Sequence, residues 1–127
     1  MTTIPIDSDS QSTAQRVADI LDAKQAGQIA LLDVSDLIQI TEAFVIASGN
    51  SRRQVITLAD ELTVQMKSEG RPPLRVEGQD DGIWLLIDFG DVIVHLFQPE
   101  PRQHYDLERL WGDAPRLVWE PASVGEV

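Results

Sequence analysis

Apolar residues recur along the chain with two different spacings, and these spacings predict where helices and strands lie. Helical spacing begins near residues 12–13, where either side chain can cap a helix, and it ends at Gly27. A second helix is predicted from a cap at residues 50–51 to Gly70. Its apolar residues form one stripe: Val55, Leu58, Ala59, Leu62 and Met66. Both helices are therefore expected to pack one face against a core.

Shorter apolar runs that are rich in branched residues predict strands. QIALLDV (28–34) and EAFVIASG (42–49) are separated by only a short connection, so these two strands are expected to be neighbours. LRVEG (74–78) is a third candidate. After two prolines, RQHYDLERLW (102–111) predicts a last helix. Three apolar residues should share one face of that helix: Leu107, Leu110 and Trp111.

The sequence GIWLLIDFGDVIVHLF (82–97) predicts a β-hairpin with a two-residue turn at Gly90 and Asp91. Side chains alternate between the two faces of a strand, so this pairing sorts the hairpin into two sets. One set is entirely apolar and is expected to form core: Leu85, Ile87, Phe89, Val92, Val94 and Leu96. The other set mixes aromatic, aliphatic and ionisable side chains: Trp84, Leu86, Asp88, Ile93, His95 and Phe97.

The mixed set is too apolar to face water alone and too polar for an ordinary core. Aromatic anchors with a few charged neighbours are typical of the centre of a protein interface. Glu77, on the preceding strand, could reach the same face. We therefore predict that Glu77 and the mixed set bind a partner. The alternative is that further helices cover this face.

The predicted elements run in the order helix, strand, strand, helix, strand, hairpin, helix. This order favours an α/β (α+β) fold in which helices pack against one mixed sheet of about five strands. There are too few strand–helix–strand units for a doubly wound fold. At 127 residues the chain has the size of one domain. That domain is predicted to span 12–114, between a flexible N-terminal tail (1–11) and an irregular C-terminal tail (115–127).

Composition narrows the classes of function. The net charge of −11 argues against direct binding of duplex nucleic acid, which depends on clustered Lys and Arg. It favours a basic protein as partner, although acidic side chains can also serve solubility alone. The chain has no cysteine, and no apolar run approaches the roughly 20 residues of a membrane span. With no signal or transit peptide recognisable, we expect a cytoplasmic protein that does not contact a membrane.

Candidate catalytic residues are few. The tripeptide DFG at 88–90 matches the metal-binding tripeptide of protein kinases, but the other kinase motifs are missing and the chain is too short. His95 is expected at an interface and His104 on the surface. Glu77, Asp88 and His95 could converge on one sheet face and hold Mg²⁺ or act as an acid–base pair. A metal-dependent enzyme therefore stays open as an alternative, although we predict neither metal nor cofactor.

Four segments, taken in their order and spacing, resemble the ribosomal silencing factor family, RsfS, also called the Iojap-like family. They are ITEAFVIASGNSRRQV, RVEG, GIWLLIDFGDVIVHLF and RQHYDLERLWGDA, and the resemblance covers about 17–114. It implies a mixed sheet with helices, similar in fold to nucleotidyltransferases but without their activity. It also implies binding to ribosomal protein L14 of the large ribosomal subunit, a steric block of subunit joining, and a homodimer when the protein is free.

Two residues depart from the segment ITDYFVI that is usual in the family, namely Glu42 and Ala43. The segment GNSRRQVITLAD carries basic residues where a nucleotidyltransferase would need paired carboxylates for two metal ions. The resemblance thus implies a non-catalytic translation repressor, and its contact surface is expected to be the sheet side that carries Trp84 and Asp88. The alternatives are a metal-dependent nucleotidyl or phosphoryl transferase and an adaptor for another basic protein.

Overall fold

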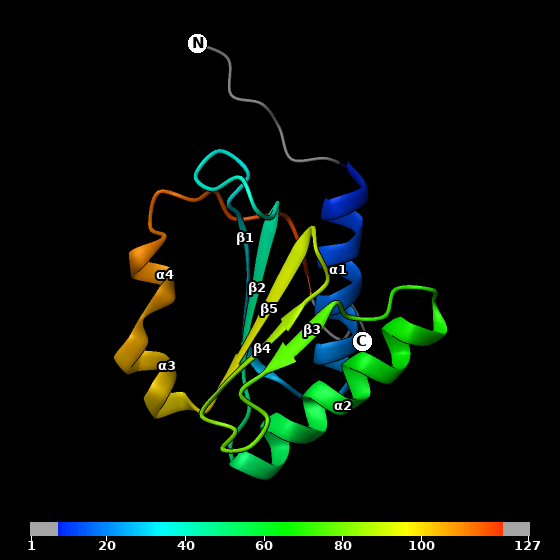
Figure 1. Ribbon diagram of the computed structural model, residues 1–127. Coiled ribbons are helices and arrows are strands. Elements are labelled where there is room, and N and C mark those ends of the chain that lie inside the picture. Colours follow the sequence, from blue (N-terminus) through cyan, green and yellow to red (C-terminus); the bar gives the residue numbers. More distant parts are fainter. Residues whose placement is uncertain (1–7, 121–127) are drawn as a thin grey trace, which may run out of the picture.

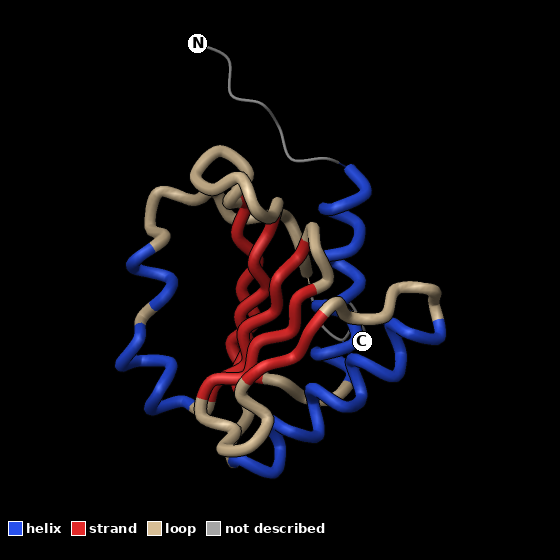
Figure 2. The backbone as a smooth tube through the Cα atoms, in the orientation of Figure 1, coloured by secondary structure: helices blue, strands red, loops and turns tan. Residues whose placement is uncertain are grey.

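The computed structural model describes residues 8–120, which form one sheet with helices on both faces (Figure 1). The strands are β1 (Gly27–Asp33), β2 (Ala43–Ser48), β3 (Arg75–Glu77), β4 (Trp84–Asp88) and β5 (Val92–Phe97). The helices are α1 (Ser8–Ala23), α2 (Arg52–Ser68), α3 (Pro99–Tyr105) and α4 (Leu107–Leu110). Helices α1 and α2 cover one face of the sheet, whereas α3 and α4 lie over the other (Figure 2).

The sheet is mixed and has the strand order β1-β2-β5-β4-β3. Strands β1 and β2 are neighbours, as the short connection predicted, and they run antiparallel. Strand β5 lies parallel to β2 and antiparallel to β4. The predicted α+β fold with about five strands is therefore confirmed. The expected likeness to nucleotidyltransferases stays a prediction.

The hairpin has the predicted register. Leu85 is paired with Leu96 and Ile87 with Val94, and the Phe89 N–H donates to the Val92 carbonyl at 2.9 Å. All six residues predicted for the apolar set are buried in the core beneath α1 and α2. The turn needs glycine, because Gly90 has a φ of 94°.

Helix α1 begins at Ser8, so the predicted start near residues 12–13 was wrong by about one turn. The early part of the helix has no apolar stripe because its buried positions hold hydroxyl side chains. Ser10 Oγ donates to Asp91 Oδ2 at 3.0 Å, and Thr13 Oγ1 donates to the Asp9 carbonyl at 2.9 Å. These bonds satisfy both hydroxyls, and Ser10 lies in the segment that the sequence pattern indicated as a tail.

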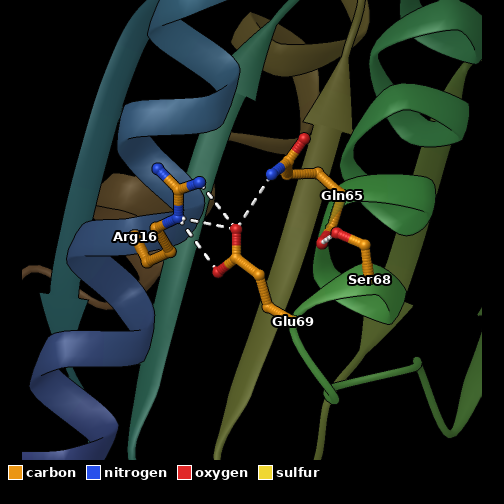
Figure 3. A network of polar contacts seen from close by, with 4 residues as sticks. All are labelled: Arg16, Gln65, Ser68 and Glu69. Atoms are coloured by element: carbon orange, nitrogen blue, oxygen red, sulfur yellow. Dashed lines mark hydrogen bonds and ion pairs between the residues drawn. The ribbon is translucent and has the colours of Figure 1, made fainter.

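Helix α2 matches its prediction closely. Ser51 is its N-cap and accepts the Gln54 N–H, and all five residues of the predicted stripe are buried. A polar network joins its C-terminal end to α1 (Figure 3). In that network Arg16 donates to both carboxylate oxygens of Glu69, its shortest bond being 2.6 Å, and Gln65 donates to Glu69 Oε2 at 3.0 Å. The hydrogen bond from Arg16, followed by that from Gln65, lowers the pKa of Glu69 to about 2.

The last predicted helix, 102–111, is two helices in the structure, and this prediction was wrong. Asp106 lies between α3 and α4 in the left-handed conformation, with φ 49° and ψ 53°. The break rotates the following residues, so Leu107 is buried while Leu110 is 70% exposed. The two prolines lie in the first turn of α3, where a missing N–H breaks no intrahelical bond.

Residues 115–120 run beside the free edge of β1 and pair with it. They form no regular strand beyond one bridge between Leu32 and Arg116. The Asp33 N–H donates to the Pro115 carbonyl at 2.8 Å, and the Leu117 N–H donates to the Leu31 carbonyl at 2.9 Å. This part of the predicted C-terminal tail therefore closes one edge of the sheet.

Candidate functional site

The outer face, which we define as the sheet face opposite α1 and α2, carries the seven predicted contact residues. Residues that pair directly across neighbouring strands project from the same face of a sheet. The pairing sets them in three rows across β3, β4 and β5: Trp84 with Phe97, Glu77 with Leu86 and His95, and Arg75 with Asp88 and Ile93. The alternation that predicted this face is thus present in the structure.

Trp84 is partly buried and is held by three neighbouring rings. Its ring centroid lies 5.1 Å from that of Phe97, in a stacked arrangement, and 4.8 Å from that of Tyr105. Its Nε1–H donates to His95 Nδ1 at 3.0 Å. Gly78 permits the close approach of the preceding turn, because a Cβ at that position would lie 2.1 Å from the Trp84 carbonyl oxygen. The orientation of the indole is therefore fixed by the fold.

His95 is 5% exposed and lies beneath Trp84. Since Nδ1 accepts the indole hydrogen bond, the neutral ring carries its proton on Nε2. Nε2 is buried and has no hydrogen-bond partner among residues 8–120. The ring of Phe44 meets the imidazole edge-on, with 4.7 Å between centroids. Burial in these apolar surroundings lowers the pKa of His95 to about 4.

The lowered pKa predicts a loss of stability in acid. The unfolded chain takes up the proton of His95 near pH 6.5, whereas the folded chain takes it up only near pH 4. The contribution of neutral His95 to the free energy of unfolding is therefore fully present above pH 6.5. It falls by about 3 kcal/mol as the pH drops to 4. Urea unfolding of the wild type at pH 7 and pH 4 measures the change.

The control for this prediction is His95→Asn, which keeps an acceptor for Trp84 but does not titrate in this range. The variant should lose about 3 kcal/mol less than the wild type between the two pH values. Equal pH dependence in both proteins would show that carboxylates, and not His95, carry the acid sensitivity.

The ionisable residues of the outer face form a chain of ion pairs. Arg75 lies 3.1 Å from Glu77 Oε2 and 3.3 Å from Asp88 Oδ2. The second oxygen of Asp88 accepts the Gly90 N–H at 2.8 Å. Leu86 stands between Glu77 and His95 in their row, so the three residues of the enzyme alternative do not form one cluster. Within residues 8–120 no three His, Asp or Glu side chains are grouped closely enough to hold a metal ion.

Helices α3 and α4 cover part of the outer face, as the alternative to a free surface had allowed. Three of the predicted contact residues are buried: Ile93 at 7% exposed, His95 at 5% and Phe97 at 1%. The Glu77 side chain is 57% exposed and the Asp88 side chain 19% exposed, while Trp84 and Leu86 are partly buried. The surface available to a partner therefore comprises Glu77, Trp84, Leu86 and Asp88, with the buried three beneath it.

Three further residues shape this region and were missed by the sequence reasoning. Arg75 lies two positions before Glu77 on the same strand face, so strand alternation alone could have found it. Tyr105 extends the aromatic surface beside Trp84 and is 47% exposed. Arg102 is buried, and it donates from Nη1 to Ser48 Oγ at 2.8 Å and from Nε to Glu108 Oε1 at 3.0 Å. No signal in the sequence distinguishes Arg102 from a solvated helix residue.

The departures from the family pattern lie at the start of β2. Ala43 is fully buried, and the backbone N–H groups of Glu42 and Ala43 both donate to the Asp91 carbonyl, at 2.9 and 3.1 Å. The carboxylate of Asp91 in turn accepts a 2.6 Å bond from Arg71. These residues therefore tie the hairpin turn to β2 and to the segment after α2.

Comparison with known proteins gives one consistent result. The sequence model of the family "Ribosomal silencing factor during starvation" matches residues 7–126. The ribosomal silencing factor RsfS of Halalkalibacterium halodurans is 39% identical over 87% of this chain and 95% of its own, and that of Bacillus subtilis is 42% identical over 74% and 80%. The chain also spans about half of the chloroplastic protein Iojap of Arabidopsis thaliana, with 33% identity. A crystal structure of a Chromobacterium violaceum protein superposes with a TM-score of 0.76, at 34% identity, over 84% of this chain and 88% of that one.

Proposed function

We propose that this chain, which belongs to the ribosomal silencing factor family, represses translation by binding the large ribosomal subunit. In this proposal its partner is ribosomal protein L14, and the bound chain occupies space that the small subunit needs. The action is steric and consumes no substrate. Membership in the family supports a translation-regulating role at the ribosome, and the partner and the steric block are our inference.

The outer face is the observation that carries the proposal. Its accessible centre combines an oriented indole, Trp84, with an aliphatic side chain, Leu86, and two carboxylates, Asp88 and Glu77. Aromatic anchors that are already fixed in the free protein lose little conformational entropy on binding. Such a surface suits contact with another protein better than it suits catalysis.

Charge supports a basic partner. The chain has a net charge of −11, and among the basic residues of 8–120 only Arg75 is paired with the carboxylates of Glu77 and Asp88. Complementary net charges speed the encounter of two proteins and fix their orientation. We therefore expect association with L14 to slow as salt concentration rises. We place this association in the cytoplasm.

We also propose that the free protein forms a homodimer through the outer face. A second copy would cover the partly buried apolar side chains that the ribosome would otherwise cover. Binding to the large subunit and dimer formation would then compete for the same residues. Sedimentation equilibrium of the free protein measures this, and a monomer at every concentration would contradict it.

Sedimentation of purified ribosomal subunits tests the main proposal. The protein should co-migrate with the large subunit and reduce the fraction of joined ribosomes in a mixture of both subunits. Equal recovery with both subunits, or with neither, would contradict the proposal. A pull-down with purified L14 then asks whether that protein alone is sufficient.

Trp84→Ala is expected to lower the affinity for L14 by about 2 kcal/mol, or roughly thirtyfold, because it removes the central aromatic anchor. It should also destabilise the fold, since His95 and Phe97 lose contacts with the indole. Circular dichroism must therefore show that the variant is folded at the temperature of the binding assay. The control is Val118→Ala, which truncates an apolar residue that is 76% exposed near the β1 edge and should bind normally.

A further inference from the structure

A hollow lies beside Trp84, between the first turn of α3 and the segment that leads into β4. Its volume is about 640 Å³, within the range of roughly 300–1,000 Å³ that is usual for binding pockets. Residues from both sides line it: Ile83, Pro99, Glu100, Pro101, His104 and Tyr105. Because the Tyr105 ring also contacts Trp84, this hollow is continuous with the outer face.

The walls of the hollow are mixed and are partly open to solvent: Ile83, Tyr105 and the two prolines are apolar or aromatic, while Asn50, Gln98, Glu100 and His104 add polar groups. Ile83 is 43% exposed and Tyr105 is 47% exposed, so both side chains are accessible to a partner. The side chain of Tyr105 and the backbone beside Ile83 are both held by neighbouring residues. The Tyr105 ring lies 4.8 Å from Trp84 and 5.2 Å from His104, and Gln98 Nε2 donates to the Gly82 carbonyl at 3.2 Å across the base of the hollow.

Two proline rings of α3 also line the hollow and restrict the backbone around it. Pro99 and Pro101 both lie in the first turn of α3, where the ring fixes φ. A hollow whose walls are fixed beforehand can receive a side chain without losing much conformational entropy of its own. The shape is therefore suited to an inserted side chain.

The rim of the hollow is acidic. Glu100 lines it, and Asp81 accepts the Ile83 N–H at 3.2 Å through its carboxylate. The nearby guanidinium of Arg52 donates to the Asp80 carbonyl, and its one positive charge is outnumbered by the carboxylates of Glu100, Asp81 and Asp80. Apolar side chains in the walls, with carboxylates near the opening, favour a ligand that has an apolar centre and positive charges around it.

We propose that this hollow is the socket for one apolar side chain of the basic partner, flanked in that partner by Lys or Arg. The inference rests on the proposed function and deepens it by assigning a contact outside the seven residues predicted from the sequence. Tyr105, whose ring contacts Trp84, forms the wall that the socket shares with the outer face, and Ile83 lines the socket from the segment that leads into β4. Burial of an apolar anchor in a preformed hollow at an interface commonly dominates affinity.

Ile83→Ala tests the socket with a matched control. It should weaken binding to purified L14 by about tenfold, since truncating an anchor contact costs more than about 1 kcal/mol. Ile40→Ala makes the same substitution at a residue that is 79% exposed in the loop between β1 and β2, at the other end of the strands (Figure 1), and should bind as the wild type does. Equal affinity of the two variants would overturn the socket.

A peptide probe separates the socket from the identity of the partner. The peptide Lys-Lys-Leu-Lys-Lys should shift the backbone amide resonances of Ile83, His104 and Tyr105 in nuclear magnetic resonance spectra, and Lys-Lys-Ser-Lys-Lys should not. Shifts with the leucine peptide alone support the socket even if the protein fails to bind L14, in which case only the proposed function is lost. Binding to L14 without such shifts, or with equal shifts from both peptides, overturns the socket and leaves the proposed function intact.

Discussion

Leu85→Ala is expected to lower the free energy of unfolding by roughly 2–5 kcal/mol, because it leaves a cavity where the side chain fills the core. Leu85 is fully buried and pairs with Leu96 in the centre of the hairpin. Its neighbours on the same face come from β4, β5 and the helices that cover them, so the cavity cannot close by moving one loop. Urea unfolding followed by circular dichroism measures the loss.

The matched control is Leu110→Ala, the same substitution at a residue that is 70% exposed on α4. It should change stability by no more than about 0.5 kcal/mol. Binding to L14 by any Leu85→Ala protein that is still folded should be close to normal, since Leu85 faces away from the outer face. An equal loss of the free energy of unfolding in Leu85→Ala and Leu110→Ala would show that the core is not centred on the apolar face of the hairpin.

The apolar face of the hairpin is where the sequence was most informative. Strand alternation leaves few choices once the turn is fixed, and Gly90 marks the turn because it supplies a positive φ. The same reasoning succeeded for α2, where five apolar residues at helical spacing are all buried. In both cases a local period carries the information, and tertiary packing agrees with it.

The predictions that failed depend on groups that are distant in the sequence. The start of α1 is stabilised by the bond from Ser10 to Asp91, 81 residues later, and no local pattern reports such a bond. The break at Asp106 is a left-handed residue that is not glycine, inside a segment whose apolar spacing suited one helix. Sequence periodicity cannot detect a conformation that the rest of the fold imposes.

The sequence also could not show which residues of the outer face are accessible to a partner. Alternation predicted which side chains share the face, but it could not predict that α3 and α4 would bury His95 and Phe97. The mixed set thus has two roles in the structure. Its buried members support Trp84, and its accessible members, with Arg75 and Tyr105, form the surface on which the proposed function depends.

Arg102→Ala is expected to lower the free energy of unfolding by about 3 kcal/mol, because it breaks a buried ion pair. The Arg102 side chain is 7% exposed and joins α3 to β2 through Ser48 and to α4 through Glu108. Its removal leaves the hydroxyl of Ser48 buried without that partner. The value is at the lower end of the usual range, since Glu108 is 28% exposed and keeps Arg116 at 3.7 Å.

The effect of Arg102 should also reach the outer face, because this arginine holds α3 and α4 over it. In Arg102→Ala the contact of Tyr105 with Trp84 should loosen. The tryptophan fluorescence of the folded protein should therefore change more than it does in Leu85→Ala, a core variant of similar expected stability. Arg116→Ala is the matched control, since it removes the other arginine beside Glu108 from a site that is 62% exposed. That control should cost no more than about 1 kcal/mol, as is usual for exposed pairs. An equal loss in both variants would mean that Glu108, and not the buried Arg102, secures α3 and α4 to the sheet.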